Sequence, residues 1–95
     1  MEIKVQSIHF DADQKLVTFV EDKLTKLTQY YDKIIVGDVF LKLEPSDIEN
    51  KVTEIKLSIP GKDLFAKKQC RTFEEATDEA VEALRRQISK HKSKK

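Results

Sequence analysis

The sequence predicts a single α+β domain with the element order β-α-β-β-β-α, in which a four-stranded mixed sheet has two helices packed on one face. Stretches in which apolar and polar residues alternate indicate strands. Two longer stretches with an apolar residue every three or four positions indicate helices. Polar, Gly or Pro residues separate these stretches, and 95 residues suffice for one domain with one hydrophobic core.

The first strand and the first helix are predicted in the N-terminal third of the chain. Over residues 2–8, Ile3 and Val5 alternate with polar residues, which is typical of a half-buried strand. Asp13 is expected to cap a helix that runs from Gln14 to about Tyr31, because its carboxylate accepts hydrogen bonds from the free amides of the first turn. The apolar stripe of this helix consists of Leu16, Val20, Leu24, Leu27 and Tyr31.

Three further strands are predicted over residues 34–43, 52–59 and 64–70. The pair Gly37-Asp38 indicates a bulge or a kink in the first of them, because a glycine otherwise only weakens a strand. A polar loop over residues 44–50 follows this strand. The last two strands are joined by a turn at Pro60-Gly61, where proline has the φ angle of the second turn position and glycine supplies a positive φ.

The second helix begins with a capping box, in which Thr72 accepts from the first turn and Glu75 reaches back from the third helical position. This helix is predicted to run to about Lys92. Its apolar stripe consists of Phe73, Ala76, Ala80, Leu84 and Ile88. Because the first helix connects the first two strands, those strands should be parallel with a right-handed crossover, and the last three strands should form an antiparallel meander.

The charge is distributed unevenly along the chain. The net charge of +1 conceals a C-terminal segment, residues 84–95, with six basic residues and no acidic one, while residues 1–83 hold 12 basic and 17 acidic residues. Acidic residues early and basic residues late in the second helix complement the helix dipole, which explains part of this pattern. The dipole effect is confined to about one turn, so the number of cations predicts a phosphate-binding surface.

Lysines on the first helix form a second basic row, which consists of Lys15, Lys23, Lys26 and Lys33. Two helices side by side on one sheet would bring this row next to the basic end of the second helix and make one patch. A topology that ends in β-β-β-α with a basic last helix is also similar to that of double-stranded RNA-binding domains, which recognise the shape of A-form RNA.

The sequence contains no arrangement of residues typical of an enzyme or a metal site. His9 and His91 lie far apart without partners at ligand spacing, and the single cysteine, Cys70, has no base partner in the sequence. We therefore predict no catalytic activity, no cofactor and no metal, and we expect a protonated His91 to contact phosphate. A single thiol, no signal peptide and no long apolar run predict a cytoplasmic protein without membrane association.

Two segments resemble one known family. FVEDKLTKLTQYYDKI (Phe19–Ile34), which runs on into VFLKLE (Val39–Glu44), resembles the first helix and second strand of the ribosome hibernation-promoting factors. This is a ribosome-associated inhibitor family once called sigma-factor modulation proteins. LRRQISKHKSKK (Leu84–Lys95) is similar to the C-terminal helix of these factors, and the resemblance covers essentially the whole chain.

The resemblance implies a single ribosome-binding domain over residues 1–92 and a basic tail over residues 93–95. Members of the family bind the small ribosomal subunit between its head and body, near the decoding channel, and block mRNA and tRNA in stationary phase or starvation. Basic side chains of their two helices contact rRNA phosphates. The rRNA-binding residues implied here are Lys23, Lys26, Arg86, Lys90 and Lys92, with Arg85 as an additional basic position.

Two features of the sequence depart from the family pattern. Glu74 stands where many members have an aromatic residue, so the contact of that aromatic is not expected. The resemblance is to the short form of the family, which lacks the second, ribosome-dimerising domain. We therefore expect a chain that silences single ribosomes or acts with a separate ribosome-dimerising factor, and that is a monomer off the ribosome. A general double-stranded RNA-binding module and a protein-interaction module that modulates a sigma factor are the alternative functions.

Overall fold

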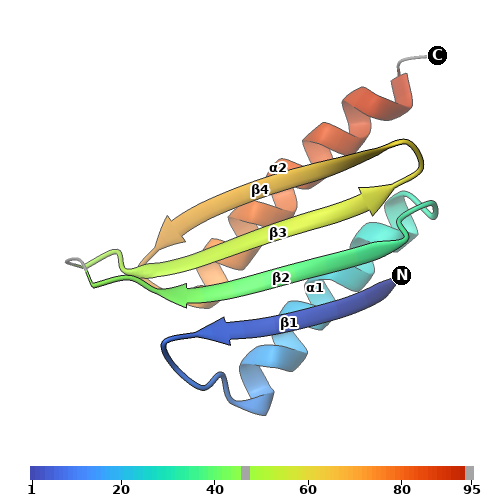
Figure 1. Ribbon diagram of the computed structural model, residues 1–95. Coiled ribbons are helices and arrows are strands. Elements are labelled where there is room, and N and C mark those ends of the chain that lie inside the picture. The colour runs from blue at the N-terminus through green and yellow to red at the C-terminus, as the bar shows by residue number, and fades with distance from the viewer. Residues whose placement is uncertain (46–47, 94–95) are drawn as a thin grey trace.

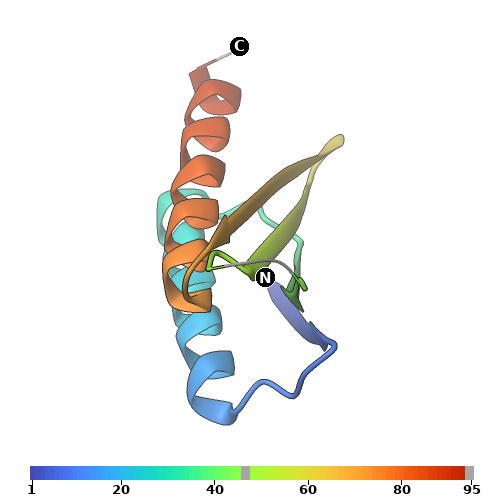
Figure 2. The ribbon, with the colours of Figure 1, turned by 90° about the vertical axis from the view of Figure 1, so that its left-hand side faces the viewer.

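The computed structural model describes residues 1–45 and 48–93 and has the predicted order of elements. The elements are β1 (Glu2–Ile8), α1 (Gln14–Tyr30), β2 (Val36–Leu43), β3 (Lys51–Ile59), β4 (Lys62–Cys70) and α2 (Phe73–Ser93). Both helices cover one face of the sheet, and no described segment covers the other face (Figures 1 and 2). The α+β prediction with two helices on one face is confirmed.

The strands lie in the order β1-β2-β3-β4. As predicted, β1 runs parallel to β2, whereas β2, β3 and β4 form an antiparallel meander. In Figure 1, α1 lies behind β1 and β2, and α2 lies behind β3 and β4. The two helices are therefore neighbours on one side of the sheet, where they contact each other.

Side-chain caps fix the beginnings of both helices. The Asp13 carboxylate accepts a hydrogen bond from the Leu16 N–H at 2.9 Å, and the Thr72 hydroxyl accepts one from the Glu75 N–H at 3.0 Å. Both predicted caps are confirmed, and each satisfies a backbone donor that the helix itself leaves free. At its other end α2 reaches Ser93, and the rest of the predicted basic tail lies outside the described residues.

The hairpin between β3 and β4 is tighter than predicted. Gly61 has the expected positive φ, 86°, and Ile59 pairs directly with Lys62 across the turn. β4 therefore begins two residues earlier than its sequence pattern indicates. The loop predicted over residues 44–50 separates β2 from β3, and its residues 46–47 lie outside the described part of the chain.

The bulge or kink predicted at Gly37-Asp38 is wrong. The pairing of β2 with both neighbours runs through this position without a break, since Gly37 pairs with Ile3 on one side and with Leu57 on the other. Gly37 is buried, and a Cβ atom built on it would lie 2.9 Å from the Leu24 Cδ2 atom of α1. A side chain at this position would have to displace the Leu24 side chain, which packs against the Gly37 backbone.

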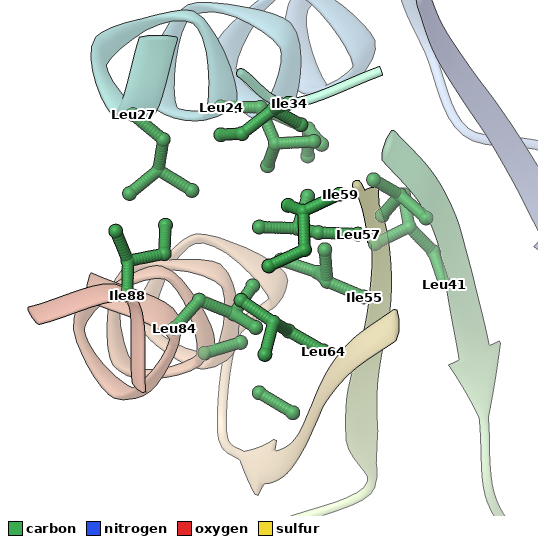
Figure 3. Packing of buried hydrophobic residues seen from close by; sticks show 14 of the residues in the cluster. Leu24, Leu27, Ile34, Leu41, Ile55, Leu57, Ile59, Leu64, Leu84 and Ile88 are labelled. Carbon is green, nitrogen blue, oxygen red and sulfur yellow. The ribbon is translucent and has the colours of Figure 1, made fainter. Parts of the chain in front are cut away.

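The hydrophobic core fills the space between the helix pair and the sheet. Leu27 of α1 and Ile88 of α2 point toward each other, and Leu84 points toward the strands (Figure 3). Full burial of a side chain of this size contributes about 1.5–3 kcal/mol. The other residues of this packed cluster are Val20, Leu24, Ile34, Val39, Leu41, Ile55, Leu57, Ile59, Leu64, Ala66, Phe73 and Ala80.

One buried polar contact links α2 to the sheet. The hydroxyls of Thr53 on β3 and Thr77 on α2 lie 3.3 Å apart, and both side chains are fully buried. A buried hydroxyl without a partner is costly, so this pair opposes sliding of α2 along β3.

The uncovered face of the sheet carries charged residues of both signs. Glu54 of β3 lies between Lys42 of β2, at 2.9 Å, and Lys67 of β4, at 3.8 Å. Phe65 of β4 is 51% exposed, and its position in the strand alternation places it on this same face.

Gly37→Ala is expected to lower the free energy of unfolding by about 1–3 kcal/mol, because the new methyl group would press against Leu24. Urea titration measures the change. In a Leu24→Ala background the same substitution should cost much less, because the obstructing side chain is absent. Equal costs in the two backgrounds would mean that Leu24 does not set the requirement for glycine.

Candidate nucleic-acid interface

The C-terminal halves of α1 and α2, which carry the candidate binding residues, lie next to each other. The helices run in the same direction, side by side (Figure 2). The Lys23 ammonium, near the middle of α1, lies 2.8 Å from the carboxylate of Asp78 in the second turn of α2. Near the ends of the two helices, Lys92 of α2 donates a hydrogen bond to the Tyr30 carbonyl of α1 at 3.2 Å. The two predicted basic rows therefore meet at this end of the helix pair.

The four candidate cations of α2 lie on two sides of the helix. Arg85 and Lys92 face α1, since both lie near the Tyr30 ring. Arg86 and Lys90 are exposed, and neither side chain forms an ion pair or hydrogen bond with the described part of the chain. These two charges are thus available to an external anion.

Arg85 is already paired within its own helix. Its guanidinium donates to the Glu82 carboxylate at 2.9 and 3.2 Å. Hydrogen bonding to Arg85 holds the pKa of the Glu82 carboxyl below its ordinary value, and the positive charges of Arg85 and Arg86 act in the same direction. An approaching phosphate would have to compete with Glu82 for Arg85.

Lys92 of α2 caps the C-terminal end of α1. Its ammonium donates to the Tyr30 carbonyl and lies 4.2 Å from the centre of the Tyr30 ring. α1 has no basic residue in its own last turn. Lys92 therefore supplies the positive charge that the negative end of the α1 dipole favours, in addition to a cation–π contact.

Of the two candidate residues of α1, one is already paired with a carboxylate and the other is not. Lys23 is paired with Asp78 and lies 5.4 Å from the centre of the Phe19 ring. Lys26 is exposed, and its ammonium makes no ion pair with a described residue. Lys15 begins the predicted row about 12 Å before Lys23 along the helix axis, far from the C-terminal ends.

The acidic residues of α2 lie in its N-terminal half. All of them precede the first cation of the helix, and they are Glu74, Glu75, Asp78, Glu79 and Glu82. The helix pair therefore has a negative N-terminal portion and a positive C-terminal portion. Phosphates are attracted to the second and repelled by the first.

Sequence reasoning missed an aromatic group beside the cations. A hollow of about 560 Å³ at the ends of the helices is lined by residues that include Tyr30, Tyr31, Lys33, His91 and Lys92. The Tyr31 and His91 rings are in edge-to-face contact, with centroids 6.0 Å apart. No local pattern connects residues so far apart in the sequence, and only the parallel packing of the helices brings them together.

Cys70 lies at the end of β4 beside two carboxylates. Its sulfur and one oxygen each of Glu75 and Glu79 are all within 4.8 Å of one another. Burial, together with the negative charges of Glu79 and Glu75, raises the pKa of the Cys70 thiol to about 11. The thiol is therefore protonated at neutral pH and is a poor nucleophile.

The sequence comparisons agree with the resemblance. Residues 3–95 match the family described as Sigma 54 modulation protein / S30EA ribosomal protein, and the chain belongs to this family. A ribosome hibernation promoting factor from Pseudomonas putida is 32% identical over 94 residues, an alignment that covers 99% of this chain and 89% of the relative. The factor of the same name from Escherichia coli K12 is 31% identical over 100 residues, with 99% and 96% covered.

Two solved structures have the same fold. A ribosomal subunit interface protein from Coxiella burnetii superposes with a TM-score of 0.88 at 21% identity, covering 99% of this chain and 100% of the other. The N-terminal domain of Protein Y from Thermus thermophilus gives a TM-score of 0.82 at 24% identity, covering 96% and 99%. None of the described helices combines the length and the apolar character that spanning a bilayer requires.

Lys92→Met is expected to lower the free energy of unfolding by about 0.5–1 kcal/mol, because methionine neither donates to the Tyr30 carbonyl nor places a charge over its ring. Chemical denaturation measures this loss. The matched control is Lys90→Met, which removes a charge that has no partner in the described structure and should cost less than about 0.5 kcal/mol. Equal losses would show that the contact with Tyr30 does not stabilise the fold.

The rate of Cys70 alkylation by iodoacetamide is expected to rise continuously from pH 7 to about 11, because only the thiolate reacts. Mass spectrometry follows the reaction, and the urea-unfolded chain should level off near the ordinary thiol pKa of about 8.5. Glu79→Gln should move the folded profile to lower pH, whereas Glu74→Gln, on the other side of α2, should not. A folded profile that coincides with the unfolded one would contradict the raised pKa.

Proposed function

We propose that this protein is a ribosome hibernation factor that binds the rRNA of the small ribosomal subunit through the outer surface of α1 and α2. In the proposed complex it lies near the decoding channel and blocks mRNA and tRNA binding in stationary phase or starvation. The observation that carries the proposal is the exposed, unpaired cation pair Arg86 and Lys90, in a chain whose relatives are named ribosome hibernation promoting factors.

The contribution of each cation to RNA binding should depend on whether it already contacts a carboxylate of the protein. Arg86, Lys90 and Lys26 have no ionic partner in the described structure, so a phosphate gains their full attraction without breaking an existing contact. Lys23 and Arg85 must first leave or share a carboxylate. We therefore expect the three unpaired cations to contribute most to affinity.

The distribution of charge also orients the proposed complex. The acidic first half of α2 would repel rRNA phosphates, so the RNA should lie against the C-terminal half of the helix pair. The uncovered face of the sheet offers no such preference, because Lys42 and Lys67 flank the carboxylate of Glu54 there.

The proposal includes a cellular setting. The protein would act in the cytoplasm as a monomer that joins the small subunit, either alone or beside a separate ribosome-dimerising factor. Many family members have an aromatic residue where this chain has Glu74. The proposed mode of binding therefore includes no aromatic contact from that position.

The test is co-sedimentation with purified small subunits over a range of salt concentrations. The double variant Arg86→Gln/Lys90→Gln is expected to bind at least tenfold more weakly at moderate salt. The slope of log affinity against log salt should decrease by about two, because two phosphate contacts no longer release counterions.

The matched control is Lys4→Gln/Lys56→Gln, which removes the same charge from exposed positions on the uncovered sheet face. This control should bind within about twofold of the unmodified chain. Equal losses in the two double variants would show that binding depends on net charge and not on the helix surface. An arbitrary RNA duplex that competes as well as small subunits would instead indicate a general RNA-binding module.

A further inference from the structure

The hollow at the C-terminal ends of the helices has the shape and position of a binding site. α2 continues beyond the end of α1, so its last turns project past the rest of the helical layer (Figures 1 and 2). The hollow lies in the angle between this projecting end and the segment that leads from α1 into β2. Its volume of about 560 Å³ falls within the range of small-molecule sites in proteins.

Two aromatic rings form one wall of the hollow. The planes of Tyr31 and His91 are inclined by 84°, with 6.0 Å between their centroids. Both side chains are only partly buried, so the corner that they form is accessible from the solvent. A planar ring can lie against one face of such a corner while its edge contacts the other ring.

Polar groups complete the lining. Lys33, Lys92 and Asp32 are among the residues that line the hollow. A lysine ammonium can bind phosphate, and a carboxylate can accept hydrogen bonds from amino or hydroxyl groups. The Lys92 ammonium is held in place by the Tyr30 carbonyl. The hollow thus combines a surface for a flat ring with cations for a phosphate.

We propose that this hollow binds one unpaired nucleotide, with its base stacked in the Tyr31–His91 corner and its 5′-phosphate beside Lys33 and Lys92. The inference rests on the proposed RNA-binding function and adds the conformation of the RNA that is recognised. A base inside a duplex has both faces covered by its neighbours, so only a bulged, looped or terminal nucleotide presents a face to the corner. The cations alone would suit any phosphate, and the aromatic corner is what selects a nucleotide.

The test compares two RNA hairpins that differ by one unpaired 2-aminopurine nucleotide in the stem. The bulged hairpin should bind at least fivefold more tightly than the fully paired one, and stacking should quench its 2-aminopurine fluorescence. The chain has two tyrosines and no tryptophan, and both tyrosines line the hollow. Their ring protons in NMR spectra therefore report directly on this site.

Tyr31→Leu keeps an apolar side chain against the core and is expected to abolish the preference for the bulge. The matched control is Phe65→Leu, which removes an exposed ring from the uncovered sheet face and should keep the preference. Lys33→Gln, at an exposed position, provides a second variant that leaves the core untouched. It should weaken binding of the bulged hairpin about threefold and leave the paired hairpin unaffected.

The outcomes separate this inference from the proposed function. Binding of small subunits with no preference for the bulge, and no shift of the tyrosine ring protons, would overturn the nucleotide site while leaving the proposed function intact. Loss of all binding to small subunits by the unmodified chain would overturn the proposed function. Ring-proton shifts of equal size with free adenosine monophosphate, but not with ribose 5-phosphate, would support the site with a free nucleotide as its ligand.

Discussion

The apolar stripes of α1 and α2 meet the sheet and each other along one seam, where Leu27 and Ile88 are excluded from solvent. This seam determines more than stability. Because it aligns the helices side by side in the same direction, it places the end of one helix beside the later turns of the other. Gly37 leaves room for the Leu24 side chain of α1 against β2, and the buried contact between Thr53 and Thr77 opposes sliding of α2. These internal contacts determine where the cations and aromatic rings at the helix ends lie on the surface.

Several cations on this surface have two roles. Lys92 neutralises the end of a neighbouring helix, and Arg85 is bound by a carboxylate one turn earlier. Such groups are held in one orientation, which reduces the entropy that they lose when a ligand arrives. Arg86 and Lys90 lack this restraint, and their charges are fully available. The helix surface therefore combines fixed cations, which define a geometry, with free cations, which supply attraction.

Local chemistry in the sequence was sufficient to predict most of the fold. Asp13 and Thr72 act as caps because of the residues immediately after them, and Gly61 has its positive φ because a two-residue turn requires it. The pairing of Arg85 with Glu82 could also have been predicted, since the two residues are three apart in a helix. By contrast, Gly37 was misinterpreted because its constraint comes from Leu24 on another element. The contact of Lys92 with Tyr30 spans 62 positions of sequence and exists only after the helices pack.

The separation of acidic and basic residues along α2 has a consequence at distances greater than any contact. The molecule is elongated, with principal extents of 43 × 23 × 18 Å, and α2 carries its acidic residues in its first half and its cations in its last turns. Such a body has a permanent electric dipole moment and experiences a torque in the field of a polyanion. It would turn its cationic end toward the polyanion during diffusion, before the surfaces touch. A larger fraction of collisions would then begin in the productive orientation, and added salt would reduce this kinetic advantage by screening the field.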